Sequence, residues 1–141
     1  ANTVQALDAR TGELIWENRI GPAPTRAYGA TRSLALYGDK VFVPTTDAKL
    51  YGLDAKTGKI VWQVSNDDLP SPLFRDPCGA QRLPNGNTVI ASYGMGGKGV
   101  KLFELTREKK VVWTWTSDRP GVHHVQILET NGKPLEGTPL R

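Results

Sequence analysis

One ten-residue segment occurs twice in this sequence, 46 residues apart. Residues 7–16 read LDARTGELIW, and residues 53–62 read LDAKTGKIVW. A degraded third copy, FELTREKKVVW, ends at Trp113. Self-similarity at a period of about 40–50 residues is typical of repeat architectures, in which each repeat is one supersecondary unit. Each copy joins two alternating apolar segments through a short turn, so the repeat predicts β-hairpins and an all-β fold.

A complete repeat is expected to hold four short antiparallel strands. Alternating or β-branched segments separated by turn residues define them in the first copy: residues 32–36, 41–45, 49–54 and 59–64. The second copy follows the same plan, with the strong turn signal Asn85-Gly86 and these strands: residues 80–83, 88–93, 100–105 and 111–116. Four antiparallel strands joined by hairpins make one blade of a β-propeller.

The two ends of the chain complement each other in this scheme. The N-terminus supplies a third and a fourth strand, residues 3–8 and 14–19. The C-terminus supplies a first strand, residues 122–128, and a poor second one in 133–140, which contains two prolines. The expected division of the single unit is therefore three blade equivalents: residues 21–66, residues 67–120, and a composite of 1–20 plus 121–141.

The repeated turn and the residue that follows it have distinct predicted roles. Asp8 and Asp54 are expected to accept hydrogen bonds from backbone N–H groups two or three residues on. Gly12 and Gly58 are expected to take positive φ. Three tryptophans share one outer-strand position and are expected to pack one blade against the next: Trp16, Trp62 and Trp113.

Composition excludes several classes of protein. Fifteen glycines and ten prolines among 141 residues favour many turns. The net charge of +4 is scattered except at Arg107, Lys109 and Lys110, so we expect no nucleic-acid partner. No apolar run is long enough to span a bilayer, and no membrane partner is expected. The N-terminus lacks the pattern of a signal peptide, which suggests a trimmed or mature chain. Cys78 is the single cysteine, so no intramolecular disulfide can form.

Residues 3–65 resemble the tryptophan-docking repeat of the quinoprotein alcohol dehydrogenase family, through Ala6-Leu7-Asp8-Ala9-x-Thr11-Gly12 with Trp16 and the matching residues 53–58 with Trp62. The resemblance implies a propeller fold, pyrroloquinoline quinone (PQQ) with calcium, and a periplasmic or secreted origin. From about residue 70 the chain resembles PQQ-like, arylsulfotransferase-like propeller repeats. This change suggests a chimera joined near residues 65–72, or a fragment. No Cys-Cys pair is present, and no segment matches the family's catalytic or calcium-binding stretches.

Candidate binding residues lie where the innermost strands begin. His123 and His124 align there with Cys78 and Gly79. Four arginines are expected near the same edge, where they would attract small anions or would instead cap carbonyls and pair with nearby aspartates: Arg26, Arg32, Arg75 and Arg82. The ligand-binding candidates are Arg32, Arg82, His123 and His124. A metal site from His123 and Cys78 is a weaker alternative. The glycine-rich residues 94–99 are interpreted as a hairpin loop, because a strand and not a helix follows them.

The function that the sequence favours is a non-catalytic scaffold or binding module. Three blades are too few to close a ring, so we expect self-association, most simply a homodimer of six blades. A small molecule in the central channel is the expected ligand, and no catalytic residue or cofactor is assigned. The alternative is a fragment or relative of a periplasmic PQQ-dependent alcohol dehydrogenase, with PQQ and calcium as cofactors.

Overall fold

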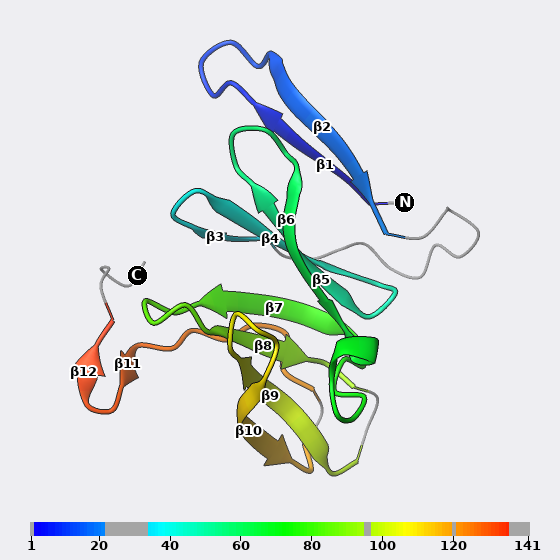
Figure 1. The fold of residues 1–141 in the computed structure, drawn as a ribbon, viewed down its shortest axis with the longest axis vertical. Helices are drawn as coiled ribbons and strands as arrows, with labels where there is room; N and C mark the ends of the chain where they lie inside the picture. Colours follow the sequence, from blue (N-terminus) through cyan, green and yellow to red (C-terminus); the bar gives the residue numbers. More distant parts are fainter. Residues whose placement is uncertain (1, 22–33, 95–96, 120, 136–141) are drawn as a thin grey trace.

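The computed structural model describes residues 2–21, 34–94, 97–119 and 121–135. Its strands form four sheets in chain order (Figure 1). β1 (Asn2–Leu7) pairs with β2 (Leu14–Ile20). The first four-stranded sheet holds β3 (Ala35–Tyr37), β4 (Lys40–Thr45), β5 (Lys49–Asp54) and β6 (Ile60–Ser65). The second holds β7 (Pro77–Arg82), β8 (Thr88–Ser92), β9 (Gly99–Leu105) and β10 (Val111–Ser117). β11 (Glu129–Thr130) pairs with β12 (Lys133–Pro134).

Both four-stranded sheets are antiparallel meanders with the order expected of propeller blades. Neighbours in the chain are neighbours in the sheet, from β3 to β6 and from β7 to β10. The one helix in the described ranges is the 3₁₀ turn η1 (Asn66–Asp68), which leads from the first sheet toward the second. The predicted all-β fold of four-stranded blades is therefore confirmed.

The sheets pack face to face, which explains why their middle strands are buried on both sides. β4 and β8 are buried almost throughout, and their β-branched and aromatic residues fit such positions. One core cluster joins the two four-stranded sheets: Phe42, Leu50, Val64, Phe74, Ile90, Phe103 and Leu105. Fully burying a side chain of this size contributes about 1.5–3 kcal/mol.

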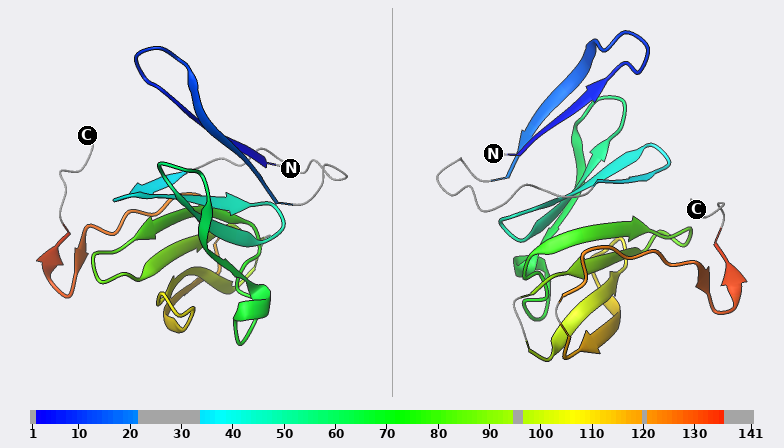
Figure 2. Two further views of the ribbon diagram at one scale, coloured as in Figure 1. Left: turned by 45° about the horizontal axis from the view of Figure 1, so that its top comes forward. Right: turned by 180° about the vertical axis from the view of Figure 1, so that it is seen from behind.

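A second core cluster fixes the β1–β2 hairpin to the outside of the first sheet. Val4 and Ile20 from the hairpin pack on Val41, Val43 and Leu53 of that sheet. The layers are thus hairpin, first sheet and second sheet, which the further views show side by side (Figure 2).

Two tryptophans join successive layers through the same contact. The Trp16 Nε1–H donates to the carbonyl oxygen of Ala55 at 2.9 Å. One sheet later, the Trp62 Nε1–H donates to the carbonyl oxygen of Arg107 at 3.0 Å. Ala55 and Arg107 occupy the same position in their turns, so each indole docks on the hairpin turn of the following sheet.

The accepting turn owes its shape to its aspartate. Asp54 Oδ1 accepts from the backbone N–H groups of Lys56 and Thr57, and from the Thr57 hydroxyl. The Thr57 hydroxyl, followed by its backbone N–H, lowers the pKa of the Asp54 carboxyl. Gly58 closes the turn with φ +69°. The first copy has the same geometry, with Asp8 bonded to the N–H groups of Arg10 and Thr11, and with Gly12 at φ +76°.

The C-terminal segment differs from its expectation. Residues 122–128 form no strand; they run beside β7, where the Gln81 side chain exchanges hydrogen bonds of 2.6 and 3.2 Å with the Ile127 backbone. The sheet that follows is a two-residue ladder ending at Pro134, which has no N–H to extend it. In the described residues β1–β2 and β11–β12 are separate sheets at opposite sides of the molecule (Figure 1).

Substituting Gly58 by alanine is expected to loosen the joint between hairpin and first sheet. A Cβ there would lie 2.5 Å from Trp16 Cε3, in addition to the strain at positive φ. Gly38→Ala is the matched control, because Gly38 has φ +56° and a Cβ added to it would meet no atom within 4 Å. The strain alone costs about 1 kcal/mol, and the overlap adds about 1–3 kcal/mol. Urea unfolding measures the free energy of unfolding of both variants. If Gly58→Ala and Gly38→Ala lose the same amount, the docking of Trp16 on Gly58 is contradicted.

Candidate functional site

Several polar and aromatic side chains meet where β7 begins. The Tyr93 N–H donates to the Asp76 carbonyl at 2.9 Å, which ties the end of β8 to the start of β7. The His123 ring stacks on Tyr93, with centroids 4.3 Å apart and planes at 29°. Gly121 lies against the Tyr93 backbone, where no Cβ would fit. The C-terminal segment therefore enters the fold at this edge and brings His123 to it.

The two histidines lie against the start of the inner strand. The carbonyl oxygen of His123 lies 3.0 Å, and the Cα of His124 3.7 Å, from the position that a Cβ on Gly79 would take. The inner strand and the C-terminal segment thus approach closely at Gly79. Both histidine residues are exposed, and the buried Cys78 lies beside them in β7, its Sγ 3.4 Å from the Asp76 carbonyl oxygen. His123 and His124 remain predicted ligand-binding residues.

Arg82 lies at the opposite end of β7, away from the histidines. Its guanidinium carbon sits 4.7 Å from the Phe42 ring centroid and 5.2 Å from that of Trp62. It also donates to the Gly86 carbonyl. Burial, and secondarily Arg107, lower the pKa of the Arg82 guanidinium. Arg82 thus bridges the two sheets by cation–π contact and caps a carbonyl.

A cavity of about 270 Å³ opens beside Arg82. It lies between β3 and β7 and is closed on one side by the C-terminal hairpin. Its lining includes Tyr37, Gln81, Arg82 and Leu135. The predicted site residues therefore divide into two places. His123 and His124 are at the start of β7, Arg82 is at its end, and Arg32 lies outside the described residues.

The expectation that Arg75 and Arg82 share one edge is wrong. Arg75 precedes the start of β7 and Arg82 is its last residue. A six-residue strand separates its two ends by about 17 Å. Arg75 instead lies near Lys101, a residue that the sequence interpretation missed. The position of a Cβ on Gly94 is 3.7 Å from the Arg75 side chain and 3.9 Å from Lys101 Nζ. The signal available was the odd lysine in the alternating sequence of β9, where Phe103 and Leu105 share its inward face.

Lys101 is the unusual charge of this edge. It is 3% exposed, and the ion pairs found in the described part of the chain do not include it. A buried ammonium is costly unless an anion accompanies it. Lys101 and Arg75 together therefore make the start of β7 a place suited to an anionic group.

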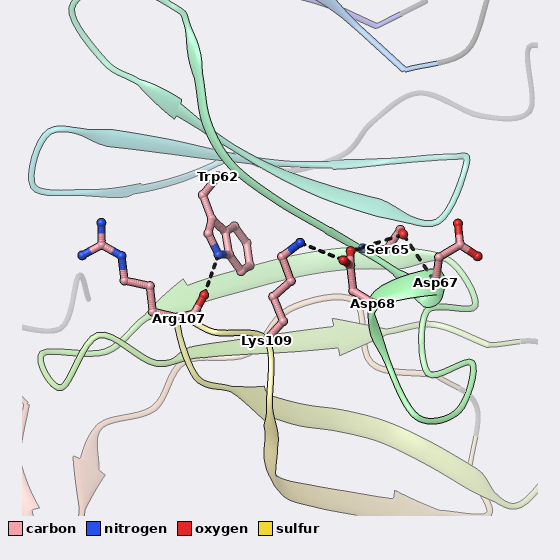
Figure 3. A network of polar contacts seen from close by, with 6 residues as sticks. All are labelled: Trp62, Ser65, Asp67, Asp68, Arg107 and Lys109. Atoms are coloured by element: carbon pink, nitrogen blue, oxygen red, sulfur yellow. Dashed lines mark hydrogen bonds and ion pairs between the residues drawn. The ribbon is translucent and has the colours of Figure 1, made fainter.

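A polar network joins the two sheets on the outer side (Figure 3). Lys109 Nζ lies 2.7 Å from Asp68 Oδ1, and the other Asp68 oxygen accepts from the Ser65 N–H at 2.9 Å. Arg107 and Lys109 belong to the turn on which Trp62 docks. The basic cluster of the sequence is therefore part of an inter-sheet joint.

The described residues do not fit a bound calcium ion. Calcium takes about six to eight oxygen ligands, with carboxylates among them. No three histidine, cysteine, aspartate or glutamate side chains gather in residues 2–21, 34–94, 97–119 or 121–135 in a way that could hold a metal. The glycine-rich residues 94–99 connect β8 to β9, as a hairpin loop does. Residues 95–96 of this segment are not among the described residues.

Within the same ranges, no helix has the length and apolar character needed to cross a membrane.

Comparison with known proteins gives consistent matches. The family described as "Outer membrane protein assembly factor BamB" matches residues 1–131. The chain is 37% identical over 105 residues to the quinohemoprotein alcohol dehydrogenase ADH IIB of Pseudomonas putida, covering 67% of this chain and 15% of that protein.

Two solved structures share the arrangement of strands. The quinohemoprotein alcohol dehydrogenase of Comamonas testosteroni aligns with a TM-score of 0.58 and 27% identity, over 96% of this chain and 20% of that one. BamB from Moraxella catarrhalis aligns with a TM-score of 0.53 and 28% identity, over 79% of this chain and 30% of that one. The chain thus spans a small part of the length of each protein it matches.

Acid titration tests the network of Figure 3. The Lys109 hydrogen bond, followed by the Ser65 N–H, holds the pKa of the Asp68 carboxyl below its ordinary value of 3.8. Because the folded-state pKa is lowered, this stabilisation is complete above the ordinary pKa and is lost as the pH falls through the folded-state value. Asp68→Asn is expected to lower the melting temperature at pH 6 and to flatten its decline below about pH 4.

Asp67→Asn is the control for that measurement, because the Asp67 carboxylate makes none of the contacts drawn in Figure 3. Circular dichroism melts across the acid range report both variants. If the melting temperatures of the wild type and Asp68→Asn fall in parallel as the pH is lowered, a role for Asp68 in acid stability is contradicted.

Proposed function

Because this chain belongs to the PQQ-like propeller family described as outer membrane protein assembly factor BamB, we propose that it is a non-catalytic propeller scaffold that self-associates into a closed ring and binds a small molecule there. The observation that carries the proposal is the pair of four-stranded sheets flanked by two unmatched hairpins. Propellers close with about four to eight blades. Two copies, each with three blade equivalents, supply six.

The exposed apolar surface supports closure by further protein. Large hydrophobic side chains stand exposed on the N-terminal hairpin and on β10: Leu7, Leu14, Ile15, Trp113 and Trp115. Large apolar side chains exposed at both ends of the stack of layers are candidates for protein–protein contact. Strand edges left by the hairpins favour the same outcome.

A small anion is the ligand class that the start of β7 favours. Lys101 and Arg75 supply positive charge, and the Tyr93–His123 stack supplies a flat, partly polar wall. Pairing would offset the cost of the buried ammonium. The ligand would then bind at one end of the central channel of the proposed ring. Arg82 would instead hold the two four-stranded sheets together.

A second candidate is a segment of a PQQ-dependent alcohol dehydrogenase. The similarity to ADH IIB favours it. The full chain mixed with PQQ and calcium would then retain quinone absorbance after gel filtration and support dye-linked alcohol oxidation. Absence of both signals favours the scaffold. For either candidate we propose a periplasmic location, in line with the family description.

The mass in solution tests the ring. Sedimentation velocity of the 15.4 kDa chain is expected to give a species of twice that mass. A well-folded monomer at all concentrations up to about 100 μM would refute self-association, because a dimer that had not formed by then would have only weak affinity.

Phosphate stabilisation tests the anion site. Inorganic phosphate is expected to raise the melting temperature of the wild type but to have little effect on Lys101→Met. Without phosphate the variant should melt at the wild-type temperature or above it, because a buried charge that takes part in none of the ion pairs of the described residues has been removed. Lys56→Met, in an exposed turn, is the control. Equal phosphate shifts in all three proteins would contradict the site.

A further inference from the structure

One of the three repeated tryptophans has no turn to dock on in the described residues. Trp16 and Trp62 each donate to the turn of the next sheet. Trp113 occupies the same position in β10, yet it is 43% exposed. Trp115, two residues further along the strand and 42% exposed, lies beside it on that face. The outer strand of the second sheet therefore carries an indole at the docking position, and the described part of the chain provides no carbonyl to accept its hydrogen bond.

One of the repeated turns correspondingly receives no indole in the described residues. The turn of residues 8–12 matches 54–58 in its aspartate hydrogen bonds and in its positive-φ glycine. The glycines differ in their surroundings. A Cβ on Gly58 would strike Trp16, whereas a Cβ on Gly12 would meet nothing within 4 Å. The turn of residues 8–12 is thus a formed acceptor with an open face.

We propose that Trp113 of one copy docks on the turn of residues 8–12 of a second copy. In this contact the Trp113 Nε1–H donates to the carbonyl oxygen of Ala9, the residue equivalent to Ala55 and Arg107. The inference rests on the proposed self-association and names the side chains that make it.

The order of the layers agrees with this contact. The second copy's β1–β2 hairpin would lie beyond β10, in the place that β3–β6 takes beyond β2. Each copy then gives one indole and receives one, so the contact occurs twice in a closed dimer.

Trp115 adds to the same surface. It stands at the position of Asn18, whose side-chain amide donates to the Gly58 carbonyl at 2.6 Å in the first joint. A second indole there widens the apolar contact. Tryptophans at the centre of an interface commonly carry much of its binding energy.

Three variants and the wild type test the proposal by sedimentation equilibrium. Trp113→Ala removes two interface hot spots from the dimer, because the contact occurs twice, and is expected to weaken it at least about 1,000-fold. Trp113→Phe keeps the aromatic rings but loses both N–H donors, and is expected to weaken the dimer about 10–100-fold. Val112→Ala removes an exposed side chain from the other face of β10 and should leave the dimer unchanged. Circular dichroism should show all three folded, since these side chains are outside the core clusters.

Hydrogen exchange of the full chain identifies the acceptor. Amides of residues 8–13 are expected to exchange more slowly in the wild-type dimer than in Trp113→Ala at the same concentration. A wild-type dimer that Trp113→Ala leaves intact, with residues 8–13 equally exchanging, would overturn this contact while self-association stands. A wild-type monomer would overturn both, and would assign Trp113 to a blade outside this chain.

Discussion

The hydrogen bond from an indole to the turn of the next sheet is the interaction on which this structure depends. A four-stranded sheet with two apolar faces is stable only when both faces are covered. The bonds from Trp16 to Ala55 and from Trp62 to Arg107 set the position of each layer on the next. The two core clusters form between layers held in that position.

The third turn shows how this joint tolerates a changed sequence. Thr106 replaces the aspartate and accepts from the Lys110 N–H at 3.3 Å. Lys109 replaces the glycine and takes φ +68°, a conformation that favours glycine. The same Lys109 pairs with Asp68 of η1, which follows the first four-stranded sheet. The Lys109–Asp68 ion pair therefore accompanies the backbone strain at Lys109. Trp62 still has the Arg107 carbonyl as its hydrogen-bond acceptor.

Local sequence predicted the strands and turns well, because alternation and turn residues act over a few neighbours. The strand at Thr88–Ser92 and the positive φ of Gly58 are examples. Residues 122–128 have the pattern of a strand but form none, since a strand needs a partner and the N-terminal hairpin lies elsewhere.

The candidate site was only partly predictable, for a related reason. Alignment of the first strands put His124 at the repeat position of Gly79 and His123 at that of Cys78. In the structure, the backbone of both histidines lies close to Gly79. The alignment could not place Arg82 between Phe42 and Trp62, because that contact joins residues 20–40 positions apart in different sheets. Lys101 was missed because its burial depends on packing between layers. Its register in β9 was the available signal.

The distribution of the four tryptophans has a spectroscopic consequence. Trp16 and Trp62 each sit in a different joint, and Arg82 lies over the Trp62 ring. Trp113 and Trp115 are exposed on β10, the outer strand of the second four-stranded sheet. Chains that retain one indole at a time would therefore carry a separate intrinsic fluorophore for each junction, and their emission would report the order in which the layers part during unfolding.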